Sequence, residues 1–192
     1  MTTSSAPQEA LRVIPLGGLG DIGRNMMLYE IGNQAIAVDC GLMFPDDEHL
    51  GVDIIIPDFS YLRDDPSRLQ ALFLTHGHED HIGAAAFLLR EFPVPVFCTR
   101  LTRGLLQVKL RDHNLQDKIE VRVVEPGQTI NIGPFGVEFF SVSHSIPDSA
   151  GMIIHTPHGP VVHTGDFKID HTPVMGQHTD LTRLAEIGRD GA

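Results

Sequence analysis

The alternation of apolar and polar positions along the chain predicts many short strands and few helices. Apolar runs of five to nine residues, bounded by glycine, proline or acidic residues, are typical of strands. These runs lie at 11–16, 26–31, 34–39, 71–75, 94–99, 118–125, 128–132, 136–144, 150–156 and 160–166. The dipeptide Gly32-Asn33 separates the second run from the third and predicts a two-residue hairpin turn.

Helical patterns are fewer than strand patterns. Residues 81–92, 100–112 and 180–188 have helical composition, and the third segment begins with an aspartate N-cap and ends at Gly188. Residues 40–62 carry prolines and acids without a period, which predicts a long loop. Strands interspersed with a few helices favour an α/β (α+β layered) architecture, in which helices cover sheets within one folded unit.

The composition is that of a globular protein. Of 192 residues, 42% are hydrophobic and 20% are charged, and a chain of this length buries a sizeable core. No apolar run reaches about 18 residues, so no membrane span is predicted. Residues 1–10 lack the basic start and apolar centre of a secretion signal, and we expect a disordered tail there. The isolated cysteines Cys40 and Cys98 favour buried thiols and a cytoplasmic location.

The charge balance bears on the function. A net charge of −11 argues against a nucleic-acid-binding module, because such modules are usually basic. It leaves open an enzyme that meets a phosphodiester through metal ions, since bound cations reverse the local field. The 11 histidines are many for a chain of this length and point to metal chemistry.

The segment FLTHGHEDHIG (73–83) carries the strongest chemical signal. It places His76, His78, Asp80 and His81 within six positions, between a predicted strand and a predicted helix. Side chains alternate in extended backbone, so the first two histidines can point the same way. Such a cluster can serve two metal ions about 3.5–4 Å apart. Imidazole and carboxylate ligands suit zinc or manganese better than calcium or magnesium.

Further ligands are expected at the ends of other strands. Asp39, His144 and Asp166 each follow or end a predicted strand, and they would converge if those strands lay side by side in the same sense. A GxGxxG pattern at 18–23 is followed by a hairpin and not by a βαβ unit, so dinucleotide binding is not predicted. Glu79 is interpreted as a solvated acid. The other histidines are interpreted as exposed or structural: His49, His113, His155, His158, His163, His171 and His178.

The order HxHxDH, then a strand-end histidine, then an aspartate resembles the motif series of the metallo-β-lactamase fold. A closer resemblance, to the ribonuclease J family of the beta-CASP subgroup, extends over nearly all of residues 11–192. Five segments carry it: GGLGDIGRN, VDCGLMFPDDEHLGVDIIIPDFSYL, LTHGHEDHIGA, SHSIPDSAG and HTGDFKIDHTPV.

This resemblance implies the fold and its extent. The expected fold is the metallo-β-lactamase αββα sandwich, of which residues 11–192 would form a partial domain, the N-terminal half, truncated before the beta-CASP insert. A further histidine ligand of the second metal would lie in the part of the family's chain that follows. His171 or His178 would be weak substitutes for it.

The resemblance also implies the roles of site residues. His76, His78 and His144 would hold the first metal, and Asp80 and His81 the second, with Asp166 bridging both. Asp80, His81 and Asp166 would be catalytic, and Asp39 would orient a ligand histidine. A structural calcium ion would be held by the carbonyl of Gly51 and by Asp53, although Asp53 could also be an ordinary loop acid.

The implied function is metal-dependent hydrolysis of RNA phosphodiesters in RNA processing and decay. Family members are 5′-to-3′ exonucleases on 5′-monophosphorylated single strands, with some endonuclease activity, and form dimers or tetramers as full-length proteins. Two alternatives remain open at this point. The chain could be another hydrolase of this fold that acts on a small ester or thioester, or a metal-binding fragment without activity of its own.

Overall fold

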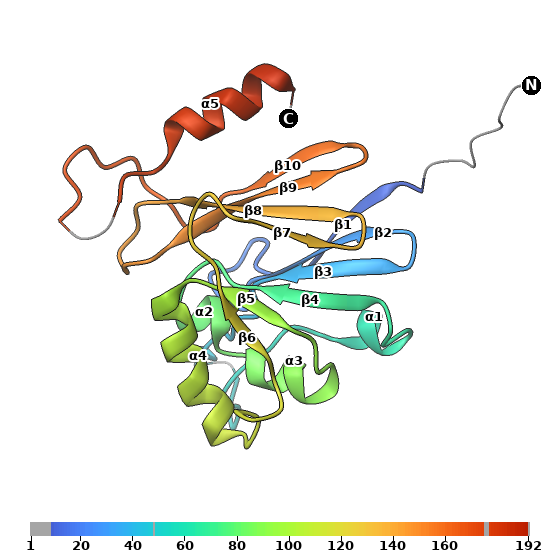
Figure 1. Ribbon diagram of the computed structural model, residues 1–192. Coiled ribbons are helices and arrows are strands. Elements are labelled where there is room, and N and C mark those ends of the chain that lie inside the picture. The colour runs from blue at the N-terminus through green and yellow to red at the C-terminus, as the bar shows by residue number, and fades with distance from the viewer. Residues whose placement is uncertain (1–8, 48, 175–176, 192) are drawn as a thin grey trace, which may run out of the picture.

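The computed structural model describes residues 9–47, 49–174 and 177–191. Most of the tail expected at 1–10 lies outside these residues. Two sheets pack face to face, and helices cover the outer face of each sheet (Figure 1). The expected αββα layering is therefore confirmed.

The larger sheet has six strands, which lie in chain order. They are β1 (Leu11–Gly17), β2 (Met26–Ile31), β3 (Gln34–Val38), β4 (Leu69–Phe73), β5 (Val96–Cys98) and β6 (Val121–Val123). The first three form antiparallel hairpins, and the Gly32-Asn33 turn is confirmed by the pairing of Ile31 with Gln34. From β3 to β6 the pairing is parallel, so the carboxyl ends of these strands meet at one edge of the sheet.

The smaller sheet has four antiparallel strands in the order β10-β9-β8-β7. They are β7 (Thr129–Ile132), β8 (Phe135–Ser141), β9 (Ala150–Thr156) and β10 (Gly159–His163). Strands β8 and β10 run in the same sense, because each is antiparallel to β9 between them. The expected convergence of strand ends therefore occurs across two sheets and not along one.

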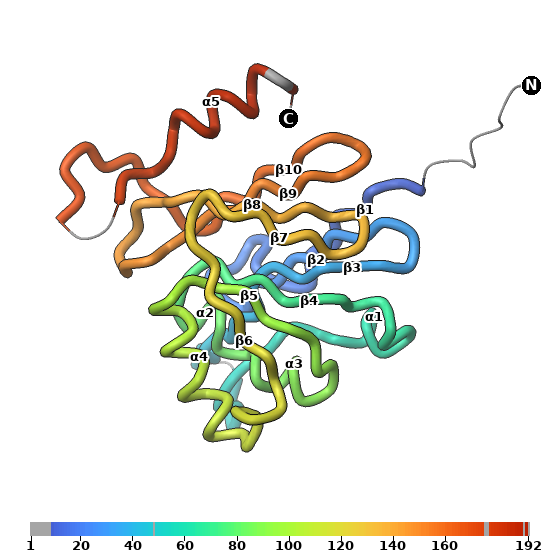
Figure 2. The backbone as a smooth tube through the Cα atoms, viewed as in Figure 1, coloured from blue at the N-terminus to red at the C-terminus, as the bar shows by residue number. Residues whose placement is uncertain are grey.

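Five helices cover the sheets in the described part of the chain: α1 (Ser60–Arg63), α2 (Glu79–Ile82), α3 (Ala85–Glu91), α4 (Arg100–Asp112) and α5 (Leu181–Asp190). The backbone trace in Figure 2 shows α2, α3 and α4 on the outer side of the six-stranded sheet and α5 beyond the other sheet. Ile187 of α5 belongs to a buried cluster with Phe140, Val142 and Ile153 of the smaller sheet. No helix in the described residues is long and apolar enough to cross a membrane.

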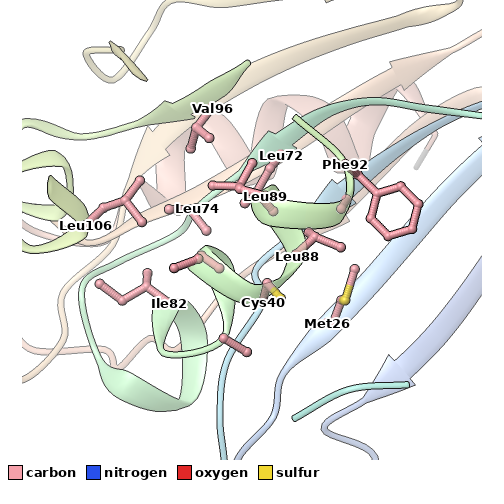
Figure 3. Close-up of a cluster of buried hydrophobic side chains, with 14 of the residues drawn as sticks. Met26, Cys40, Leu72, Leu74, Ile82, Leu88, Leu89, Phe92, Val96 and Leu106 are labelled. Carbon is pink, nitrogen blue, oxygen red and sulfur yellow. The ribbon is translucent and has the colours of Figure 1, made fainter. Parts of the chain in front are cut away.

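Two apolar layers hold these elements together. Between the sheets, the rings of Phe73 and Phe97 stack with centroids 5.0 Å apart, and Phe139 of the smaller sheet packs beside them. On the other face, Leu72 and Leu74 pack against α2, α3 and α4 (Figure 3). Strand β4 thus buries both of its faces, which explains why its sequence is apolar without alternation.

The structure differs from the predicted elements in several places, and β5 and β10 are among the strands that are shorter than predicted. The helix expected at 81–92 is split, because the amide of Ala84 donates to the carbonyl of Cys40, outside the helix. Helix α1 ends the segment predicted as a loop, and β6 is shorter than predicted. Helix α5 has the predicted Asp180 N-cap but runs through Gly188, and Gly191 with a φ of 90° follows its end. A Cβ on Gly188 would meet no atom within 4 Å, so packing does not require glycine at this position and the helix does not end there.

Candidate metal centre

Three histidines meet where the two sheets face each other. Two of them lie in the segment between β4 and α2. The Nε2 atom of His76 lies 3.0 Å from Nδ1 of His78, and Nε2 of His144 lies 3.3 Å from that same Nδ1. His144 comes from the loop after β8, in the smaller sheet. Three imidazole nitrogens thus converge, as a single cation with tetrahedral coordination requires.

A second group of ligand atoms lies beside the first. The Nε2 atom of His81 is 3.5 Å from Oδ2 of Asp80 and 3.5 Å from Oδ1 of Asp166. The other carboxylate oxygen of Asp166, Oδ2, is 3.7 Å from Nε2 of His144. The Asp166 carboxylate therefore directs one oxygen toward each group of histidines.

This donor set fits divalent cations. Within residues 9–47, 49–174 and 177–191, two sets have ligand atoms all within 4.8 Å of one another: His76, His78 and His144, and His76, His81 and Asp166. Imidazole nitrogens and carboxylate oxygens are the ligands that zinc and similar ions take in proteins. The two sets share His76, so the centre is one continuous site.

A buried carboxylate orients the histidine of the second group. Asp39 follows β3 with a φ of +61°, and its Oδ2 is 2.8 Å from Nδ1 of His81. Thr75 donates to Asp39 through its backbone N–H at 2.8 Å and through Oγ1 at 2.8 Å. With Nδ1 held by the carboxylate, Nε2 of His81 faces Asp80 and Asp166, where a cation would displace its proton.

The electrostatics of this pair follow from burial and charge together. Burial alone would lower the pKa of His81, but Asp39 and then Asp80 outweigh it and raise the pKa to about 10. Burial would likewise raise the pKa of Asp39, but the facing His81 imidazolium leaves it lowered. For His76, burial and the charge of His81 lower the pKa to about 3, so its imidazole is neutral and can bind a metal.

The backbone packs tightly behind residues 76–81, which are called the metal loop below. A Cβ on Gly41 would lie 1.6 Å from the carbonyl oxygen of Asp80, so no other residue fits there. The amide of Cys40 donates to the carbonyl of His81, and that of Leu42 donates to Glu79. The segment after β3 therefore supports the loop that carries the ligand side chains.

One residue near the centre, Asn25, escaped the sequence analysis, and His163 lies close by. The side-chain nitrogen of Asn25 lies 3.3 Å from Nε2 of His81, and the only sequence signal for it is its position at the end of GGLGDIGRN. His163, interpreted as exposed or structural, accepts or donates a 2.9 Å hydrogen bond with the Tyr29 hydroxyl. It lines a cavity together with Asp39 and Asp166.

The remaining predicted residues lie apart from the centre. Gly51 and Asp53 are exposed in the loop after β3, and Asp53 is in neither set of clustered ligand atoms among the described residues. His171 and His178 are exposed as well. Glu79, interpreted as a solvated acid, is half exposed and accepts two 2.6 Å hydrogen bonds from Lys109 of α4. Cys40 and Cys98 are buried free thiols, as predicted.

Relatives of known name resemble the chain over nearly its whole length. Ribonuclease J of Synechocystis is 42% identical over 95% of this chain, and ribonuclease J of Helicobacter pylori is 45% identical over 96%. Ribonuclease J 2 of Staphylococcus aureus is 41% identical over 100%. The chain spans only 29%, 27% and 34% of these three relatives, respectively.

Solved structures and a family profile agree on the fold. The metallo-beta-lactamase fold protein YhfI of Bacillus subtilis superposes with a TM-score of 0.63 at 19% identity, over 85% of this chain and 65% of that one. A protein of unknown function from Enterococcus faecalis gives 0.63 at 21% identity, over 83% and 44%. The profile of the metallo-beta-lactamase superfamily matches residues 19–180. The chain, with its two facing sheets and its histidine centre where strand ends meet, belongs to the metallo-beta-lactamase superfamily.

Proposed function

We propose that the chain is the N-terminal catalytic part of a ribonuclease J-type RNA phosphodiester hydrolase that works with two metal ions. The observation that carries this is the Asp166 carboxylate, which lies between His81 and His144 with an oxygen toward each. Identity of 41–45% to proteins named ribonuclease J supports RNA as the substrate. The acidic chain would meet RNA through its cations, since they reverse the local field.

The two groups of ligand atoms support the proposed division of roles between the ions. His76, His78 and His144 would hold the first ion, and Asp80 and His81 the second, with Asp166 shared. Zinc and manganese both suit these donors. Two such ions, when bound, supply Lewis acidity that lowers the pKa of water and stabilises charge on phosphate oxygens.

The chain's own residues would orient the reaction. Asp39 and Thr75, both buried, fix the ring of His81 so that its Nε2 faces the site. Asp80, His81 and Asp166 are the catalytic residues in this proposal, because they would hold the second ion and Asp166 would be shared with the first. Asp166 is 47% exposed, so its carboxylate is accessible to a substrate.

Finer features remain part of the proposal. The similarity to ribonuclease J supports 5′-monophosphorylated single-stranded RNA as the substrate, 5′-to-3′ exonuclease activity with some internal cleavage, a cytoplasmic location and assembly of the whole protein into dimers or tetramers. Gly51, with a φ of +77°, and Asp53 would hold a structural calcium ion through a carbonyl and a carboxylate.

Metal stoichiometry followed by RNA cleavage tests the proposal. The chain, loaded with zinc or manganese, is compared with His78→Ala and with His158→Ala, an exposed histidine in the turn between β9 and β10. The proposal is supported if the chain binds two ions and cleaves 5′-monophosphorylated RNA, and if metal binding and cleavage are lost in His78→Ala but kept in His158→Ala. Hydrolysis of a small ester or thioester without RNA cleavage would assign the chain to the alternative hydrolase class. Two bound ions without any hydrolysis would contradict catalysis by this chain alone.

A further inference from the structure

The glycine-rich segment 17–25 has no part in the proposed function, yet its last residue lies against the candidate metal centre. The backbone N–H of Asn25 donates to the carbonyl of Asp80 at 3.0 Å, and its side-chain Nδ2 donates to the same oxygen at 3.0 Å. The carbonyl of Asn25 accepts from the amide of Gly41 at 2.9 Å. Through Asn25, the residue before β2, the backbone is therefore bonded both to Asp80 of the metal loop and to Gly41 in the segment that packs behind it.

The Asn25 amide also faces the atoms proposed to bind the second cation. Nδ2 lies 3.4 Å from Oδ2 of Asp80 and 3.3 Å from Nε2 of His81. An amide nitrogen carries two N–H donors, so one can serve the Asp80 carbonyl while the other serves the Asp80 carboxylate. A carboxylate held by such a donor is fixed in the direction of its ligand oxygen.

The glycines of the segment make room for this asparagine. A Cβ on Gly18, whose φ is +82°, would lie 2.4 Å from Oδ1 of Asn25. A Cβ on Gly17 would lie 2.1 Å from the carbonyl oxygen of Arg24. Close packing beside Asn25 therefore explains Gly17 and Gly18, whereas Gly23 packs against Met43 and a Cβ on Gly20 would meet no atom within 4 Å.

We propose that Asn25 is a positioning residue of the second cation site, which holds the Asp80 carboxylate and the Asp80–His81 backbone in ligand geometry. This rests on the two-cation part of the proposed function and not on the identity of the substrate. Its effect is local, because among the described residues the polar contacts of the Asn25 side chain are to Asp80 and His81 and none is to His76, His78 or His144.

Cobalt(II) titration of the 192-residue chain tests the inference, since cobalt reports each binding step by its absorption spectrum. The parent is compared with Asn25→Ala and with Asn131→Ala, an exposed asparagine on β7. We expect two cobalt ions in the parent and in Asn131→Ala. In Asn25→Ala the first step should be unchanged, and the second should weaken about 10- to 100-fold with an altered spectrum.

Three results would overturn the inference: an unchanged second step, equal weakening of both steps with a lower melting temperature of the metal-free protein, or a single cobalt ion in the parent. Asn25→Leu keeps the number and branching of the side-chain heavy atoms and removes the polar atoms, and it gives the same comparison where Asn25→Ala does not fold. RNA cleavage is assayed separately. A chain that binds two cobalt ions as expected and cleaves no RNA would contradict the proposed function and leave the role of Asn25 intact.

Discussion

The Nδ1 atom of His81 lies 2.8 Å from Oδ2 of Asp39, and these side chains are only 4% and 2% exposed. A carboxylate can only accept at this position, so His81 must carry a proton on Nδ1. The pair therefore fixes which nitrogen faces the metal centre. It also places the residue that follows β3 behind a candidate ligand from α2, at the edge where the parallel strands end.

We predict that Asp39→Asn weakens the second cation about 10- to 100-fold, the range found for partners of metal ligands. The amide that replaces the carboxylate would present a donor to Nδ1 of His81, moving the imidazole proton to the nitrogen that should bind the ion. Isothermal titration with zinc measures this change. Asp58→Asn, an exposed carboxylate bonded to Ser60, is the control and should bind both ions normally. Equal affinities in the two variants would contradict the orienting role.

Two glycine-to-alanine substitutions are expected to change the free energy of unfolding in opposite directions. Gly41→Ala would place a Cβ 1.6 Å from the Asp80 carbonyl oxygen, a clash with backbone that only a shift of the metal loop can relieve. We expect a loss of about 2 kcal/mol or more in the free energy of unfolding, together with weaker metal binding. Gly104→Ala lies in α4 with no atom within 4 Å of the new Cβ and should gain up to about 1 kcal/mol.

Urea unfolding of the metal-free variants measures both effects, and zinc titration follows the metal site. Gly104→Ala should bind zinc as the parent does, because α4 keeps its position. A Gly41→Ala variant with parental stability and parental zinc affinity would show that the start of α2 can move without cost, contrary to the packing seen behind it.

Much of the fold could be predicted from local patterns. Strand positions, the Gly32-Asn33 hairpin and the Asp180 N-cap follow from periodicity and short-range hydrogen bonds, which a sequence displays directly. The split between α2 and α3 could not be predicted in this way. It depends on the bond from Ala84 to the Cys40 carbonyl, a contact between segments far apart in the sequence.

The candidate site shows the same division. The residues of HxHxDH could be predicted because several candidate ligands lie close together in the sequence. His144 and Asp166 could be predicted because they lie at the ends of predicted strands. Their approach to the cluster required a second sheet facing the first, which no strand pattern specifies. Asn25 could not be predicted, because a single amide after a glycine loop has no signature until the fold places it beside His81.

The attachment of α5 should depend on pH through Glu138. This carboxylate accepts hydrogen bonds from Arg183 at 2.7 and 2.9 Å, which lower its pKa, and the bond from His155 lowers it further. Because the folded-state pKa lies below the unfolded value of 4.5, the stabilisation is complete above pH 4.5 and is lost as the pH falls below it.

Glu138→Gln tests this dependence. We expect it to lower the free energy of unfolding by about 1–2 kcal/mol at neutral pH, with a difference from the parent that shrinks below pH 4.5. Urea midpoints across the pH range measure it. Glu186→Gln, which loses a single 3.0 Å bond from Arg183 on an exposed carboxylate, should change stability by less than about 1 kcal/mol. A pH-independent difference for Glu138→Gln would contradict the shift.

A buried hydroxyl reinforces the link between the two segments that reach the centre from the smaller sheet, which are also joined by the backbone bond from the Lys168 amide to the Ser143 carbonyl at 2.8 Å. Oγ1 of Thr179 donates to the carbonyl of Lys168 at 2.8 Å and accepts from the amide of Ser143 at 2.9 Å. Those partners lie one residue from His144 and two residues from Asp166. Thr179 is 7% exposed, so solvent cannot replace its hydroxyl.

Thr179→Val keeps the shape of the side chain and leaves the Ser143 amide without its partner. We expect a cost of about 1–3 kcal/mol in the free energy of unfolding, the penalty for an unsatisfied buried donor. Because the segment next to His144 then keeps only its backbone bond to Lys168, the first zinc ion should also bind more weakly, and zinc titration beside urea unfolding separates the two effects. Thr129→Val, on the exposed side of β7, should change stability by less than about 0.5 kcal/mol. If Thr179→Val destabilises the fold and leaves zinc affinity intact, the hydrogen bonds of the Thr179 hydroxyl stabilise only the sheet. The position of His144 is then set by the strand that precedes it.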